Sequence, residues 1–88
     1  MKKDNVFVLT INNNLQGCFI NTTVLKEYII GYLDWRIKGD DYGKPDGNEL
    51  KDLLAAKEYV KDLDFTTMGP GSGRFFFGIK VECTELHI

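Results

Sequence analysis

The chain has 88 residues, 43% apolar and 12% aromatic, with 11 Lys and Arg against 13 Asp and Glu for a net charge of −2. This length and composition favour a single folded domain over residues 1–88 and disfavour a disordered chain. No apolar run reaches the roughly 18 residues that a membrane span needs, so we expect a cytoplasmic protein without membrane contact.

The first predicted elements are two strands. Residues 6–11 (VFVLTI) are β-branched and aromatic, and three asparagines follow them. Asparagine tolerates the left-handed backbone that tight turns use, so the pattern predicts a strand that ends in a turn. Residues 15–20 (LQGCFI) then return as a short second strand.

A long helix is predicted next, over residues 23–38, with Asn21 or Thr22 as its N-cap. Apolar residues cover more than half of its circumference, so this helix either lies in the centre of the fold or presents part of its surface to a partner. The residues that repeat at i, i+3 and i+4 spacing and predict its buried stripe are Leu25, Tyr28, Ile29, Tyr32 and Leu33.

A second helix is predicted over residues 47–63, after a polar linker in which Gly39 is a suitable helix stop. Asp46 followed by Glu49 has the spacing of a reciprocal capping box. A narrower apolar stripe leaves Tyr59 on the far side and indicates a helix packed by one face. The stripe consists of Leu50, Leu53, Leu54 and Val60.

The C-terminal part predicts two more strands around a glycine-rich loop. Residues 64–68 read as a short strand, and from Arg74 to Thr84 polar and apolar residues alternate. The alternation predicts Phe76 on the polar face of the strand. It places on the core face Phe75, Phe77, Ile79, Val81 and Cys83.

The predicted order along the chain is therefore ββααββ. Such an order is typical of an α+β fold in which a small antiparallel sheet of about four strands packs with two helices.

The glycine loop, GPGSG at residues 69–73, lacks the features of a phosphate-binding loop. Its glycines are spaced by two, no Lys-Ser or Lys-Thr follows, and the next element is a strand instead of a helix. The sequence is typical of a tight turn between two strands, because Pro70 presets φ and the glycines accept positive φ.

Catalytic and metal-binding constellations are missing from the sequence. The sole histidine, His87, is the penultimate residue, and the two cysteines, Cys18 and Cys83, predict reduced thiols. No Ser-His or Cys-His arrangement of known spacing is present. We therefore expect a protein that is not an enzyme and that uses no cofactor and no metal.

The charges are unevenly distributed. Between Asp40 and Asp64 lie eight acids and four lysines, which give this segment −4. Two interpretations remain open, a solvated helix with internal ion pairs and an acidic face that approaches a basic protein surface. For the second, the candidate partner-binding residues are Asp40, Asp41, Tyr42, Asp46, Glu49, Asp52, Tyr59, Asp62 and Phe76.

The leading functional hypothesis is a small non-catalytic domain that binds another protein. Nine lysines against two arginines suit a phage or mobile-element inhibitor that blocks the basic surface of a host nucleic-acid-binding protein. One alternative is a self-associating module such as a homodimer. Another is a weak single-stranded nucleic-acid binder that uses Arg74, Phe76 and Lys80, although the negative net charge disfavours direct nucleic-acid contact.

Overall fold

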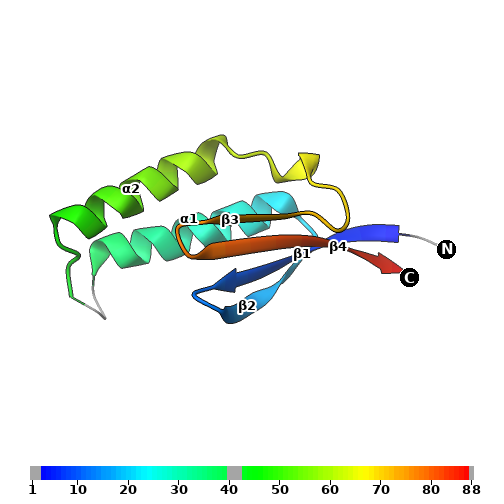
Figure 1. Cartoon of the computed structure of the whole chain (residues 1–88), viewed down its shortest axis with the longest axis horizontal. Coiled ribbons are helices and arrows are strands. Elements are labelled where there is room, and N and C mark those ends of the chain that lie inside the picture. The colour runs from blue at the N-terminus through cyan, green and yellow to red at the C-terminus, as the bar shows by residue number, and fades with distance from the viewer. Residues whose placement is uncertain (1–2, 40–42, 88) are drawn as a thin grey trace. The chain divides into compact units, whose positions relative to one another are not determined.

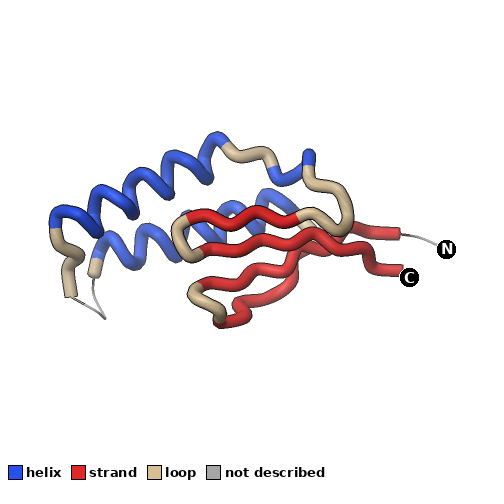
Figure 2. Tube along the Cα trace, viewed as in Figure 1, coloured by secondary structure: helices blue, strands red, loops and turns tan. Residues whose placement is uncertain are grey.

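The computed structural model describes residues 3–39 and 43–87 and has the predicted ββααββ order, an α+β fold (Figure 1). A single 3₁₀ turn, η1, lies between the second helix and the third strand, and loops join the other elements (Figure 2). The elements are β1 (Lys3–Ile11), β2 (Asn14–Phe19), α1 (Thr22–Lys38), α2 (Gly47–Asp62), η1 (Phe65–Thr67), β3 (Gly73–Phe76) and β4 (Ile79–His87).

The four strands form one antiparallel sheet in the order β2-β1-β4-β3. β1 and β4 are its long central pair, in which Lys3 lies opposite His87 and Ile11 opposite Ile79. β2 and β3 are shorter and lie at the edges. The contacts between residues divide the chain into two compact units, residues 1–25 with 64–88 and residues 26–63. We call them the sheet unit and the helical unit.

Both hairpins of the sheet unit close with two-residue loops in the left-handed conformation. Asn12 and Asn13 have φ of 50° and 67°, and Phe77 and Gly78 have φ of 50° and 78°. Paired positive φ values are typical of the turns that match the twist of antiparallel strands. The two loops lie together, because the Asn12 amide donates to the Gly78 carbonyl at 2.9 Å.

The second loop corrects the strand predicted from Arg74 to Thr84. The turn at Phe77 and Gly78 splits it into β3 and β4, with Phe76 directly opposite Ile79. Directly paired residues share a sheet face, so Phe76 joins Ile79 on the buried face and is 7% exposed. Phe75 and Phe77 are 74% and 53% exposed, which makes their predicted core positions wrong.

The segment 64–68 is not a strand. Residues 65–67 form η1, which Asp64 caps by accepting a hydrogen bond from the Thr66 amide at 3.0 Å. Phe65, the first residue of η1, and Met68, which follows the turn, are buried in the sheet unit. An aspartate side chain that bonds the backbone two residues on favours a turn over a strand, which explains the difference.

The glycine loop is a turn that leads into β3, as predicted, although η1 instead of a strand precedes it. Gly71 has φ of 87°, and its amide donates to the Cys83 carbonyl at 2.8 Å. The Cys83 amide in turn donates to the Ser72 carbonyl at 2.9 Å. These two bonds fix the loop against β4.

In the helical unit, α1 and α2 run antiparallel (Figure 1). α1 is capped by Asn21, whose Oδ1 accepts from the amides of Thr23 and Val24 at 2.8 and 3.2 Å. It ends at Gly39, which has φ of 72°. The predicted end signals of this helix are thus confirmed.

The predicted stripes are only partly confirmed. On α1, Leu25, Ile29 and Leu33 are buried, whereas Tyr28 is exposed and Tyr32 half-buried. On α2, Val60 is buried together with Ala56, which the prediction missed, and Leu50 and Leu53 are half-buried. Leu54 is exposed, so its predicted place in the stripe is wrong.

The two cysteines lie on different strands and opposite faces of the sheet. Cys18 lies opposite Val8 and is exposed, whereas Cys83 lies opposite Phe7 and is buried. Val8 and Phe7 are neighbours on β1 and point to opposite faces. Both thiols are free, as the sequence predicted.

Candidate functional site

Two of the predicted partner-binding acids have structural roles in the helical unit. Asp46 caps α2, since its Oδ1 accepts from the Glu49 amide at 2.8 Å. The Glu49 carboxylate pairs with Arg36 of α1. The Asp46 half of the predicted capping box is therefore present, whereas the Glu49 carboxylate does not cap the helix and links α2 to α1.

Two further links join the same helices. Lys57 of α2 pairs with Asp34 of α1 at 2.6 Å, and Lys26 Nζ donates to the Lys61 carbonyl at 2.7 Å. Within α2, Lys61 also pairs with Glu58 at 3.5 Å. Several cations of this unit are thus engaged inside it.

The remaining described acids of the prediction lie on one side of α2. Asp52, Tyr59 and Asp62 fall within an arc of about 80° around the helix axis. All three are exposed, Tyr59 by 42%. Among the described residues, neither Asp52 nor Asp62 forms an ion pair. We call Asp52, Tyr59 and Asp62 the acidic face.

The other predicted site residues are not brought to this face. Asp40, Asp41 and Tyr42 lie outside the described residues. Phe76 belongs to the buried face of the sheet unit, so its predicted exposure is wrong.

The pairing of β3 with β4 also separates Arg74 and Phe76 from Lys80, the three residues of the nucleic-acid hypothesis. Arg74 lies opposite Val81, and Phe75 lies opposite Lys80. Arg74 and Phe76 therefore share one face of the sheet and Lys80 lies on the other. The exposed aromatic beside Lys80 is Phe75, which the sequence argument missed. The signal for this reversal is Gly78, because a glycine that interrupts an alternating run indicates a turn.

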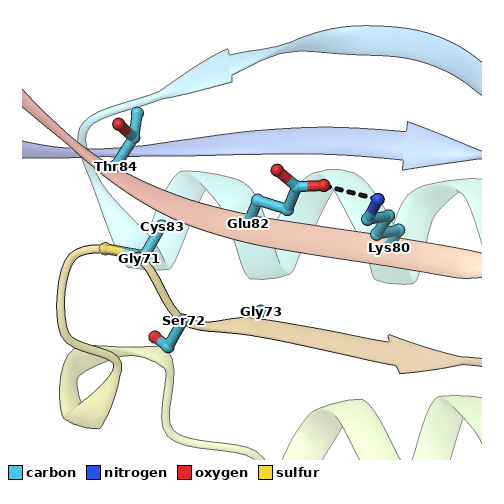
Figure 3. A pocket seen from close by; sticks show the side chains of 7 residues that line it. All are labelled: Gly71, Ser72, Gly73, Lys80, Glu82, Cys83 and Thr84. Atoms are coloured by element: carbon cyan, nitrogen blue, oxygen red, sulfur yellow. Dashed lines mark ion pairs between the residues drawn. The ribbon is translucent and has the colours of Figure 1, made fainter.

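Two depressions of the sheet unit adjoin the glycine loop and share Ser72 and Gly73. The first has a volume of about 340 Å³ and also contains Lys80 and Glu82 (Figure 3). These two side chains pair with each other at 2.5 Å, so neither charge is left for a ligand without breaking the pair. The second, of about 300 Å³, is lined by Thr67, Met68, Gly69, Ser72, Gly73 and Arg74.

Cys83 borders the first depression, but its thiol is not prepared for nucleophilic chemistry. Burial raises the pKa of this thiol above its ordinary value. Its Sγ lies 3.8 Å from the Met68 carbonyl, to which it donates a weak hydrogen bond. A raised pKa keeps the proton on sulfur near neutral pH, whereas the reactive form is the thiolate.

Metal ligands do not gather in the described part of the chain, where no group of three His, Cys, Asp or Glu side chains is placed to hold an ion. None of the described helices has the length and apolar character needed to cross a bilayer. The described structure is that of a small α+β protein with exposed acidic and aromatic surfaces. Comparison of the chain with protein-family models, curated proteins and solved structures finds no match.

Proposed function

We propose that the chain is a small non-catalytic domain that binds a basic surface of another protein through its acidic face. One observation carries the proposal: Asp52 and Asp62 lie on the same side of α2 as the exposed Tyr59 and form no ion pair with any described residue. Of the neighbouring lysines, Lys57 and Lys61 have acidic partners of their own, and Lys51 forms no ion pair with a described residue.

This combination suits a protein interface. Tyrosine contributes a large apolar ring with a polar hydroxyl, and it is enriched among the residues that dominate binding energy. Carboxylates beside such a residue attract and orient a partner of opposite charge, and their effect falls as salt rises. The finer hypothesis is that the partner is a nucleic-acid-binding host protein and that the chain is a phage or mobile-element inhibitor.

The test is affinity capture with matched charge reversals. The immobilised chain is exposed to a lysate of its native host, and each captured protein is then purified and its Kd measured. D52K and D62K change the net charge by the same amount as E27K. Glu27 is a suitable control because it is an exposed acid of α1 without an ion pair in the described structure.

We expect D52K and D62K each to raise the Kd by about tenfold or more, and E27K to leave it nearly unchanged. Higher salt should weaken binding by the wild type more than binding by D52K. Equal increases of the Kd in D52K and E27K would mean that binding depends on net charge alone. An unchanged Kd in D52K and D62K would mean that the acidic face does not contact the partner.

Self-association is a second candidate, which the position of Phe75 favours. This side chain is 74% exposed on β3, an edge strand that a second copy could extend. Sedimentation at several concentrations should then show a dimer that F75K dissociates. A monomer at all concentrations would exclude this candidate.

A further inference from the structure

The guanidinium group of Arg74 has no partner among residues 3–39 and 43–87. The side chain lies on the buried face of the sheet unit, opposite Val81, and is half-buried. Its Nε is buried and makes no hydrogen bond. No carboxylate of the described residues pairs with it.

Such an arrangement is costly unless something outside the described chain completes it. Burying a donor without a hydrogen-bond partner destabilises the folded state, and the cost is larger when the group is charged. A buried polar group without a partner in a native structure calls for a specific explanation, for example an ion or ligand that completes it.

The surroundings of Arg74 suit a ligand. Arg74 lines the depression of about 300 Å³ that the glycine loop borders, and no acidic side chain lines it. The loop is held in place by its bonds to Cys83 of β4. A volume of this size is at the small end of known ligand sites.

Arg74 is also the lining side chain whose donors are not used by hydrogen bonds within the described residues. The Thr67 hydroxyl donates to the Asp64 carbonyl at 2.9 Å, and the Ser72 hydroxyl donates to the Gly69 carbonyl at 2.5 Å. A hydroxyl has one hydrogen to donate, so both are already used. The Asp64 carboxylate, the acid closest in sequence to the lining residues, accepts from the Thr66 amide and hydroxyl.

We propose that this depression binds a small oxyanion, a carboxylate or a phosphate, through the guanidinium group of Arg74. The planar fork of an arginine donates two parallel hydrogen bonds to either group, which a lysine does not reproduce. The site lies in the sheet unit and is independent of the acidic face of α2, so either proposal can fail alone.

The chain offers an internal control for the test, because Arg36 and Arg74 are its two arginines. The Nε–H group of each gives a separate NMR signal, and Arg36 already pairs with Glu49. Inorganic phosphate and acetate are titrated separately at constant ionic strength. We expect the chemical shifts of the Arg74 Nε–H group and the Gly73 amide to change saturably, with a Kd on the order of 1–10 mM. The chemical shift of the Arg36 Nε–H group should stay constant.

The two titrants distinguish a phosphate site from a carboxylate site. Tighter binding of phosphate assigns the site to phosphorylated molecules, and tighter binding of acetate assigns it to carboxylates. R74Q should abolish the saturable shift at Gly73. R74K, which keeps the charge, should weaken it by about tenfold. Equal shifts at Arg36 and Arg74, or no saturable shift below about 50 mM of either ion, would overturn the proposal.

Discussion

The two units of the chain use their charged residues in opposite ways. In the helical unit, Arg36 pairs with Glu49 and Lys57 with Asp34, whereas Asp52 and Asp62 form no ion pair within the described part of the chain. In the sheet unit, Lys80 and Glu82 pair with each other, and Arg74 has no partner among the residues that the structure describes.

The difference is informative because the net charge of −2 does not reveal it. Under the two proposals, the helical unit would bind a basic partner through carboxylates, and the sheet unit would bind an anion through a single guanidinium group. The units also differ in their buried residues. Four described residues of the helical unit are buried, whereas ten of the sheet unit are. We therefore expect the largest effects on stability in the sheet unit.

The largest effect is expected at the third strand. Phe76→Ala removes a buried ring and should lower the free energy of unfolding by about 3–5 kcal/mol. The neighbouring substitution Phe75→Ala removes an exposed ring and should change it by no more than about 0.5 kcal/mol. Urea unfolding of both variants measures the difference. The opposite ranking would mean that the alternation continues through Phe77 and Gly78.

An intermediate effect is expected at two glycines of the helical unit. A Cβ at Gly39, where φ is 72°, would lie 2.5 Å from the Gly43 carbonyl oxygen, so Gly39→Ala should cost about 2 kcal/mol. Gly31 lies exposed inside α1 with no atom near its Cβ position. Gly31→Ala should stabilise the protein by about 1 kcal/mol. Thermal unfolding of the pair measures both, and effects of equal sign would be inconsistent with the described end of α1.

A smaller effect tests the contrast between the two arginines. Arg36→Met breaks the pair with Glu49 and should lower the free energy of unfolding by about 0.5–1 kcal/mol. Arg74→Met replaces an unpaired cation by an apolar side chain and should raise it by up to about 1 kcal/mol. Denaturant unfolding at low phosphate measures both. A loss of stability in both variants would indicate that Arg74 has an internal partner.

The smallest effect concerns the cysteines and is a pH dependence. Burial raises the pKa of the Cys83 thiol, so the folded chain holds this proton where the unfolded chain releases it. The free energy of unfolding is therefore unaffected by this thiol below its ordinary pKa. It decreases as the pH rises from the ordinary pKa to the raised pKa of the folded chain. Between about pH 7 and about pH 10, the wild type should lose more stability than Cys83→Ala. The matched variant Cys18→Ala, at an exposed thiol, should behave like the wild type.

Much of the fold could be predicted from local sequence. Asn21, Asp46 and Gly39 marked helix ends correctly because capping depends on a few neighbouring residues. The asparagines after residue 11 marked the first hairpin for the same reason. The order ββααββ followed from these signals and from hydrophobic periodicity, but its last two strands agree in number because two errors compensate. Residues 64–68 are not a strand, and the strand predicted from Arg74 to Thr84 is two strands.

The second hairpin could not be read in the same way. A phenylalanine with positive φ is rare, so Phe77 gave no turn signal and only Gly78 did. Missing that turn reversed the faces of Phe75 and Phe76, because a two-residue loop resets the alternation. The sequence also could not show which acids of the predicted surface are paired. Composition located the acids, but the pairing of Glu49 with Arg36 depends on how two helices lie together.

The most direct test of whether the two units bind ligands of opposite charge is a chemical-shift map with two titrants. Amide and Nε–H signals of the labelled chain are followed as the captured partner or inorganic phosphate is added. We expect the partner to shift the signals of residues 52–62 of α2, and phosphate to shift those of Arg74 and the glycine loop. Partner shifts confined to the sheet unit, or phosphate shifts of equal size at Arg36 and Arg74, would contradict this expectation.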